Sequence, residues 1–259
     1  MSQIKPPINI YTSTYMQPLF SIITVTYNAS ATVRPTLESV KEQTCRLYEY
    51  LVIDGLSTDN TVDIVKEADI DNCVVTSERD RGLYDAMNKG LGLANGDYVI
   101  FLNAGDTFHS PLTLEHFAEA IMDNDYPGIV YGQTDIVNAR RERIGSRHFT
   151  APETLTLESF SNGMVVCHQA FVVLRKLTNN FDTRYKYSAD YEWCIRCLQR
   201  SHRNQYLDEV VIDYLNEGVT THNRWQSLCE RFNIMTYYYG FFPTLFRHIK
   251  KVVKLLVRK

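Results

Sequence analysis

The chain has 259 residues and a mass of 30.0 kDa, which suits one large α/β domain or one domain with an appendage. With 44% hydrophobic and 22% charged residues, its composition excludes a disordered or fibrous protein. The net charge of −3 excludes a protein that binds nucleic acid through its overall field, so we expect no nucleic-acid partner.

The first part of the chain alternates between strand and helix patterns. Residues 1–18 are polar, contain three prolines and predict a leader on the surface. The apolar runs that follow are short and β-branched, as in buried parallel strands, and segments with helical spacing separate them. The predicted strands are 20–26, 50–54, 73–77 and 98–102, and the predicted helices are 32–43, 61–67 and 83–94. This order predicts an α/β fold with a doubly wound, mainly parallel sheet.

The second half of the chain is less regular. The predicted strands are 129–131, 165–174 and 210–215, and the predicted helices are 154–160 and 191–200. His168 and Gln169 interrupt the second of these strands. From residue 225 onward the pattern is helical, and Pro243 marks a break or a restart.

Polar side chains follow the predicted strands at the points where the strands end. These residues are Tyr27 and Asn28, Asp54, the segment 78–81, and Asn103 with Asp106. Because ligands bind at the carboxyl ends of parallel strands, we expect these side chains to meet in one crevice. The chain has no P-loop signature, and its Gly-x-Gly at 90–92 lies late in a helix, so neither a P-loop nor a dinucleotide-binding loop is expected.

A nucleotide sugar would need a pocket for its base and a cation or basic groups for the diphosphate that leaves. Asp54 can accept hydrogen bonds from a base or a ribose, and Asp106 can bind a hard cation that prefers oxygen ligands. Asp54 could instead cap a helix or close a turn. The same alternative applies to Asp106, although the small residues before it suit the close approach of a ligand to the backbone.

Five segments in this order resemble family 2 glycosyltransferases of the GT-A fold, over about residues 19–215. The segments are 24–28 (Thr-Val-Thr-Tyr-Asn), 54–61 (Asp-Gly-Leu-Ser-Thr-Asp-Asn-Thr), 78–90, 94–97 and 101–106 (Phe-Leu-Asn-Ala-Gly-Asp). The resemblance implies an inverting hexosyl- or N-acetylhexosaminyltransferase that uses a nucleotide-diphosphate sugar, for which we expect a UDP-sugar. The implied acceptor is a hydroxyl of a glycan or a lipid-linked acceptor, in bacterial surface-polysaccharide biosynthesis.

The resemblance also divides the chain. It implies a GT-A domain over 19–222, with a donor half at 19–107 and an acceptor half at 108–222, after a leader at 1–18 and before a helical tail at 223–259. In the donor site that it implies, the regions of Tyr27, Asn28 and Asp54, with Thr26, hold the nucleobase. Other residues line the ribose, diphosphate and sugar, namely Arg79, Asp80, Asp85 and Asn88, and the site also includes Asn103, Ala104 and Gly105. His168 and Gln169 resemble a segment just upstream of the acceptor site and are added to the residues that bind the nucleotide sugar, where they contact the donor or acceptor sugar or serve the structure.

Residues 103–106 stand where the family carries its Asp-x-Asp metal motif. Asn103 and Gly105 replace carboxylates of that motif, so Asp106 is its only anionic ligand. The resemblance implies Mn²⁺ or Mg²⁺, held mainly by Asp106 and the donor diphosphate, with His222 as a further candidate ligand. The reduced motif keeps a second interpretation open, a catalytically silent nucleotide-binding or scaffold relative of the same fold.

The segment 181–193 resembles the Glu-Asp motif of the family, with Ala189 in the Glu position. The resemblance implies that Asp190 is the general base that deprotonates the acceptor hydroxyl. Asp190 would also open a helix, where a carboxylate is an ordinary cap. Glu192 is the alternative carboxylate.

The C-terminus is basic, since no acidic residue follows Glu230. Apolar residues over 245–256 fall on one helical face and Lys or Arg residues on the others, which predicts a helix on an anionic membrane surface. Packing of this helix on the body is the alternative, and its charges exclude a membrane span. We expect a cytoplasmic protein, peripheral at the inner face of the cell membrane.

The six cysteines lie in apolar or helical patterns, and the N-terminus lacks the pattern of a secretory signal, which together favour a reducing compartment. Cys194 and Cys197 form a single Cys-x-x-Cys pair. Without a second pair we interpret them as two cysteines on a helix face rather than a redox or zinc site.

Overall fold

The structure is a computed structural model, and it describes residues 17–216 and 224–257. The strands are β1 (Phe20–Thr26), β2 (Tyr48–Asp54), β3 (Cys73–Ser77), β4 (Tyr98–Phe101), β5 (Thr107–Phe108), β6 (Ile129–Val137), β7 (Arg143–Ser146), β8 (Phe171–Leu174) and β9 (Asn204–Leu215). The α-helices are α1 (Val33–Lys41), α2 (Thr61–Glu67), α3 (Leu83–Leu93), α4 (Thr113–Asp123), α5 (Ala189–Arg200), α6 (Arg224–Tyr239) and α7 (Phe241–Val257).

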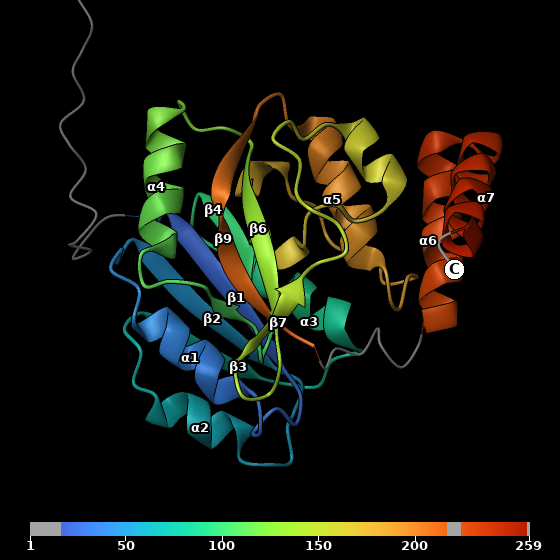
Figure 1. The fold of residues 1–259 in the computed structure, drawn as a ribbon. Coiled ribbons are helices and arrows are strands. Elements are labelled where there is room, and N and C mark those ends of the chain that lie inside the picture. The colour runs from blue at the N-terminus through green and yellow to red at the C-terminus, as the bar shows by residue number, and fades with distance from the viewer. Residues whose placement is uncertain (1–16, 217–223, 258–259) are drawn as a thin grey trace, which may run out of the picture.

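One nine-stranded sheet forms the centre of the molecule, in the order β3-β2-β1-β4-β8-β6-β9-β5, with β7 paired to β6 (Figure 1). The first four strands are parallel, because each is joined to the next through a helix. The remaining pairings are antiparallel except β6 with β9. The expected α/β fold is confirmed, and its parallel part is concentrated in the first hundred residues.

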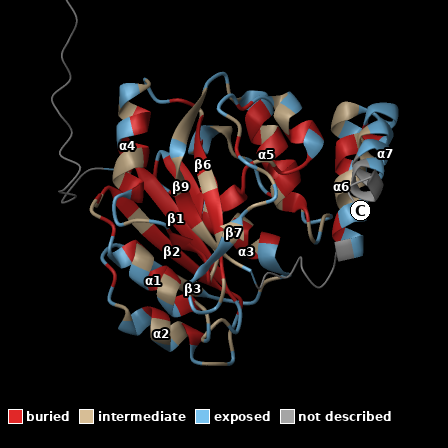
Figure 2. Ribbon diagram, viewed as in Figure 1, coloured by how far each residue is buried: buried red, intermediate tan, exposed pale blue. Residues whose placement is uncertain are grey.

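The strand order reverses between β1 and β4. Right-handed crossovers therefore place α1 and α2 on one face of the sheet and α3 on the other. Such a switch point is where open α/β sheets bind ligands. Figure 2 shows the buried strands enclosed by helices that expose their outer faces. Gly90 lets α3 approach β1, because a Cβ at this position would lie 2.5 Å from Cγ2 of Ile23.

The second half differs from the prediction in detail. Its predicted strand at 165–174 is limited to β8, and the 3₁₀ turn His168–Ala170 precedes it. The predicted helix at 154–160 is the 3₁₀ helix Leu157–Asn162. The short strands β5 and β7 were not predicted, since runs of two and four residues are too short to show a period.

The helical tail forms a hairpin of α6 and α7, which lies beside α5 (Figure 1). The break falls at Gly240, which has a positive φ of 86°, and Pro243 lies in the first turn of α7, where proline is tolerated. The Tyr239 hydroxyl donates to the Leu157 carbonyl at 2.8 Å, so the hairpin is joined to the body. No helix in the described ranges is long and apolar enough to cross a membrane.

Cys194 and Cys197 are free thiols buried in α5, as the helix-face interpretation predicted. Burial raises the pKa of both thiols, that of Cys197 to about 12. They therefore belong to the packing of the helix.

Candidate functional site

The ends of β1, β2 and β3 converge, as the sequence predicted. A Cβ added to Gly55, the residue after β2, would collide with Oδ2 of Asp80 and lie 3.4 Å from the ring of Tyr27. These residues follow three different strands, so the ends of the three strands lie next to one another at the carboxyl edge of the sheet. The Tyr27 side chain is 66% exposed, which leaves its ring accessible to a planar base.

Asp54 is buried at the end of β2, and its carboxylate accepts four hydrogen bonds. The donors are the Thr26 hydroxyl at 2.9 Å, the Ser57 amide at 2.9 Å, the Ser57 hydroxyl at 2.5 Å and the Ser77 hydroxyl at 2.7 Å. Burial raises the pKa of Asp54, but these bonds outweigh it and hold the pKa below its ordinary value. Asp54 thus closes the turn, as the alternative interpretation had it, and its contact with a donor stays a prediction.

Asn28 joins the loops that follow β1 and β2. Its φ of 49° is left-handed, a conformation that asparagine tolerates better than most residues. Its side-chain oxygen accepts from the backbone amide of Thr58 at 2.8 Å, and its backbone amide donates to the Ser57 hydroxyl at 2.9 Å. The predicted base-binding residues therefore lie on two loops that are fixed to each other.

The residues predicted to line the ribose, diphosphate and sugar differ in their contacts and in their exposure. Asp80 accepts from the Gly82 amide, and Asp85 pairs with Arg81 at 2.9 Å in the first turn of α3. Arg79 is exposed next to them. The Asn88 side chain exchanges two hydrogen bonds with the backbone of Phe181, at 2.6 and 3.0 Å, and so joins α3 to the second half of the chain.

The loop from Asn103 to Asp106 follows β4 at the switch point. The Thr36 hydroxyl accepts from the Gly105 amide and donates to the Asp106 carbonyl, so the N-terminal part of α1 fixes this loop. Gly105 has a φ of 101°, which side chains rarely adopt, and a Cβ there would contact Leu215. Backbone geometry accounts for the glycine at this position of the motif, and Ala104 lies beside it.

Asp106 is almost fully buried, with 4% of its surface exposed. Oδ2 accepts from the Gln169 side chain at 2.6 Å, and Oδ1 accepts from the Leu215 amide at 2.9 Å. Burial outweighs these bonds and raises the pKa of Asp106 to about 6. The carboxyl is therefore poorly stabilised as an anion in the structure as it stands.

These residues offer a small set of oxygen ligands for a divalent cation. Oδ1 of Asn103 is buried without a hydrogen-bond partner, and the Asp106 oxygens each retain a lone pair beside the bonds that they accept. Within residues 17–216 and 224–257 no three His, Cys, Asp or Glu side chains form a metal cluster. The set fits a cation only where the phosphates of a donor supply further ligands. His222 lies outside the described residues.

Asp190 lies in the first turn of α5, and its carboxylate is turned toward two side chains. Oδ1 accepts from the Tyr84 hydroxyl at 3.0 Å, and Oδ2 lies 3.2 Å from Nδ1 of His168. Burial raises the pKa of Asp190, but the hydrogen bond and charge of His168, with a smaller effect from Arg231, hold it below its ordinary value. Asp190 is therefore an ionised carboxylate at neutral pH.

The turn Cys167-His168-Gln169 connects the two aspartates. Nε2 of His168 lies 3.2 Å from the side-chain amide nitrogen of Asn103, and Nδ1 on the other side of the ring faces Asp190. The next residue, Gln169, holds Asp106. The structure thus gives His168 and Gln169 supporting contacts with Asp190 and Asp106, and a contact with a sugar stays a prediction.

Sequence reasoning missed Tyr84 and Arg141. Tyr84 falls within a segment that carries the family resemblance, but its position in a helix resembles any apolar helix residue. Arg141 extends from the β6–β7 hairpin to the Gly105 carbonyl at 2.7 Å. Neither contact leaves a signal in the sequence, because the partners are far apart along the chain. Tyr84 and Asp190 are 106 residues apart, and Arg141 and Gly105 are 36 residues apart.

Glu192, the alternative carboxylate, is bound elsewhere. Both of its oxygens lie 2.8 Å from Nε of Arg196, and the Tyr238 hydroxyl donates to one of them at 2.6 Å. The geometry therefore favours Asp190 over Glu192 as the carboxylate next to the strand ends.

Comparison with known proteins agrees with this geometry. The family model described as "Glycosyl transferase family 2" matches residues 21–181. A "PGL/p-HBAD biosynthesis glycosyltransferase" of Mycobacterium bovis (strain BCG / Pasteur 1173P2) is 32% identical over 211 residues, which cover 78% of each chain.

Solved structures share the fold at lower identity. TarS 1-349 of S. aureus, crystallised with UDP-GlcNAc, has a TM-score of 0.67 at 19% identity and covers 89% of this chain and 72% of its own. The mannosyltransferase PcManGT of Pyrobaculum calidifontis, crystallised with GDP-Man and Mn²⁺, has a TM-score of 0.64 at 18% identity, with 94% and 72% covered. The expected GT-A fold is confirmed, and the chain belongs to family 2 of the glycosyltransferases.

Proposed function

We propose that this glycosyltransferase transfers a hexosyl or N-acetylhexosaminyl group from a UDP-sugar to a hydroxyl of a glycan or lipid-linked acceptor, with inversion, in surface-polysaccharide biosynthesis. The single observation that carries the proposal is the placement of Asp190. It is a buried, ionised carboxylate that His168 connects to Asn103, the first residue of the loop after β4. The UDP-GlcNAc bound to TarS, which has the same fold, supports the choice of nucleotide.

In this proposal Asp190 accepts the proton of the acceptor hydroxyl while the hydroxyl oxygen attacks the anomeric carbon. The bond from that carbon to the diphosphate breaks on the opposite side, and the diphosphate leaves with the electron pair. His168 keeps the carboxylate ionised, and Tyr84 and His168 together orient it before the proton arrives. The loops at Tyr27, Asn28 and Asp80 hold the nucleotide.

We propose Mn²⁺ or Mg²⁺ as the cofactor, with Asp106 and Asn103 among its ligands. A bound cation neutralises the charge of the leaving diphosphate. The unpaired Oδ1 of Asn103 and the Mn²⁺ of PcManGT support this choice. The cation and the donor would bind together, since Asp106 is the only carboxylate of the loop.

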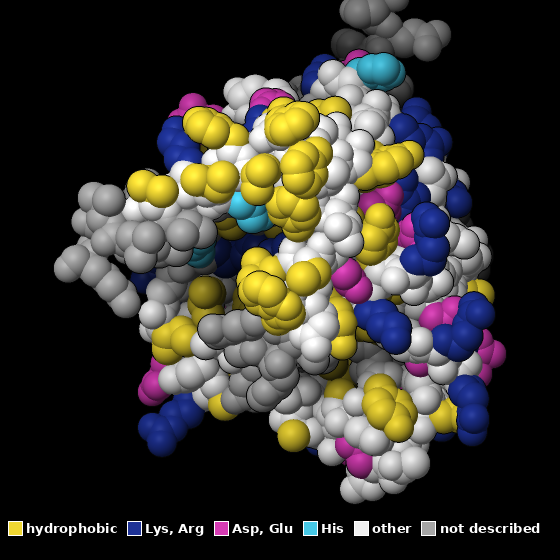
Figure 3. Space-filling model, turned by 90° about the vertical axis from the view of Figure 1, so that its right-hand side faces the viewer, with side chains coloured by type: hydrophobic (Ala, Val, Ile, Leu, Met, Phe, Trp, Pro, Cys, Tyr) yellow, Lys and Arg dark blue, Asp and Glu magenta, His cyan; other side chains and the backbone are white. Residues whose placement is uncertain are grey.

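We also propose that α6 and α7 lie on an anionic surface at the inner face of the cell membrane. Figure 3 shows hydrophobic side chains gathered on the face that these helices form. The exposed aromatic residues of α6 and α7 include Trp225, Phe242 and Phe246, and Phe242 is 79% exposed. Exposed aromatic side chains next to the basic C-terminus suit the membrane interface.

The decisive experiment for the chemistry is the substitution Asp190→Asn. UDP release from a panel of UDP-sugars should fall by a factor of about 10² to 10⁴, because the base is lost, while calorimetry should find the affinity for UDP unchanged. The matched control is Asp125→Asn, which makes the same chemical change at a carboxylate that is 97% exposed. Full activity in Asp190→Asn would eliminate Asp190 as the base.

The silent relative stays as a second candidate, because each oxygen of Asp106 already accepts one hydrogen bond, from Gln169 or from Leu215. Calorimetry of the wild-type chain with UDP and Mn²⁺ separates the two candidates. Binding with turnover of any UDP-sugar supports the transferase, whereas no binding under any condition supports the silent relative.

A further inference from the structure

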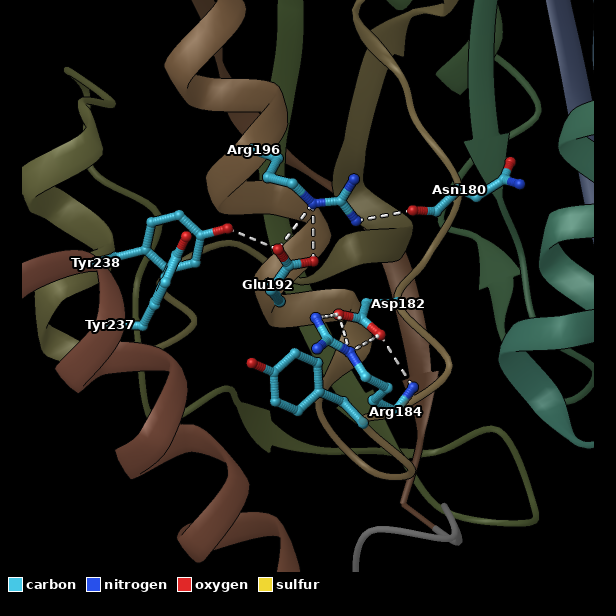
Figure 4. Close-up of a pocket in the computed structure, with 8 residues that line it drawn as sticks. Asn180, Asp182, Arg184, Glu192, Arg196, Tyr237 and Tyr238 are labelled. Atoms are coloured by element: carbon cyan, nitrogen blue, oxygen red, sulfur yellow. Dashed lines mark hydrogen bonds and ion pairs between the residues drawn. The ribbon is translucent and has the colours of Figure 1, made fainter.

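A cavity of about 580 Å³ lies between α5, α6 and the segment that precedes α5 (Figure 4). Its volume falls in the range of about 300–1,000 Å³ that is usual for ligand sites. The walls come from Asp182, Arg184, Glu192, Arg196 and a group of tyrosines. None of these residues belongs to the strand ends that are proposed to hold the nucleotide.

The charges of this cavity cancel. Arg196 binds both oxygens of Glu192 at 2.8 Å, and Arg184 pairs with Asp182 at 2.6 Å. Two carboxylates thus face two guanidinium groups, and Figure 4 shows each pair joined within the cavity. A wall of this kind offers many hydrogen-bonding groups without a net field, so it favours a neutral polar ligand over a phosphate or a cation.

Tyrosines supply the apolar part of the wall. Tyr237 is 80% exposed, and its ring stands nearly perpendicular to that of Tyr238, with centroids 4.9 Å apart. Tyr238 is fixed through its hydroxyl to Glu192, and Tyr185 lines the cavity from the segment before α5. A pyranose ring has C–H faces that pack on aromatic rings and hydroxyl edges that bind planar polar groups, so this lining matches an uncharged sugar.

The cavity is separate from Asp190 but connected to it. Glu192 follows Asp190 by two residues in α5, so the two side chains project about 200° apart around the helix. The segment that precedes α5 also contains Phe181, which stacks on Tyr84 with ring centroids 5.6 Å apart. The side chain of Asn88 forms two hydrogen bonds with the backbone of Phe181. A ligand in the cavity would thus contact the same turn of α5 that carries Asp190.

We infer that this cavity is a subsite for a neutral sugar residue of the acceptor, away from the hydroxyl that reacts. The inference rests on the proposed function, because only a transferase with a glycan acceptor needs a second sugar site. Its position next to α6 brings the sugar to the edge of the exposed aromatic surface of the helical hairpin.

The test is saturation-transfer NMR on the full chain with methyl glycosides of glucose, galactose, mannose, N-acetylglucosamine and rhamnose. At least one should bind, and Tyr237→Ala should weaken its binding by about three- to tenfold, the usual value of an aromatic contact. Since Tyr237 is exposed, its removal should leave the fold and the affinity for UDP unchanged. Trp225→Ala is the matched control, an exposed aromatic residue on the same helix.

The outcomes separate the subsite from the function on which it rests. Binding that Tyr237→Ala weakens and Trp225→Ala and Asp190→Asn preserve supports the subsite. Three results overturn the subsite. They are no binding of any glycoside, binding that Tyr237→Ala does not weaken, and tighter binding of methyl β-D-glucuronide than of the neutral glycosides. If the chain binds neutral glycosides at Tyr237 but neither binds UDP nor turns over UDP-sugars, the sugar site is supported and the proposed function is refuted.

Discussion

Replacing Asp106 by asparagine should stabilise the protein at neutral pH, although it removes the carboxylate proposed for the metal. Burial raises the pKa of Asp106 to about 6, whereas an aspartate in an unfolded chain ionises near pH 3.9. Between about pH 4 and pH 6 the folded chain therefore keeps a proton that the unfolded chain has lost.

The magnitude follows from this difference in bound protons. Between these two pKa values the folded state binds one proton more than the unfolded state. The free energy of unfolding therefore falls by about 1.4 kcal/mol for each unit by which the pH rises through this range. Over about two units the cost reaches about 3 kcal/mol, which is fully present above about pH 6 and absent below about pH 4. The asparagine side chain in Asp106→Asn would keep an acceptor for the Leu215 amide and would have no charge to bury.

Urea unfolding of the wild type and Asp106→Asn, at several pH values from about 4 to 8 and without metal or nucleotide, measures this cost. The stability of the wild type relative to the variant should fall as the pH rises and then level off. The control Asp125→Asn should follow the wild type, since its carboxylate is exposed. A difference between wild type and Asp106→Asn that is constant across this range would refute the assigned burial cost.

Three further substitutions test the site and the packing. His168→Ala removes the group that holds down the pKa of Asp190, so the acid limb of the rate profile of UDP release should move to higher pH. Tyr84→Phe keeps the ring but loses the hydrogen bond to Asp190, and kcat should fall by about tenfold with UDP affinity unchanged. Gly90→Ala should destabilise the chain by about 1–3 kcal/mol in urea, because the methyl group meets a β1 side chain, whereas Gly92→Ala should be neutral or stabilising.

Each of these has a result that contradicts it. An unchanged pH profile in His168→Ala would show that the imidazole does not act on Asp190. A loss of UDP affinity in Tyr84→Phe would place this hydroxyl at the nucleotide. Equal stabilities of Gly90→Ala and Gly92→Ala would mean that α3 does not depend on its close contact with β1.

The sequence by itself determined the strands of the first half and the edge at which they meet. Apolar β-branched runs such as the one that ends at Thr26 are local patterns, and the alternation with helices makes the sheet parallel. Parallel strands end at the same edge, so Tyr27, Gly55 and Asp80 had to converge. The tertiary structure was needed only for the detailed contacts between them.

Tertiary structure alone decided how the aspartates are held. Asp190 gains its ionised state mainly from His168 and is oriented by Tyr84, and Asp106 owes its raised pKa to burial beside Gln169 and Leu215. A motif can mark a carboxylate, but its pKa and free lone pairs depend on groups that the fold brings from elsewhere in the chain, some of them from 60 or more residues away. The Gln169 bond to Asp106 and the Tyr84 bond to Asp190 span such separations, and no periodic pattern of side chains encodes them.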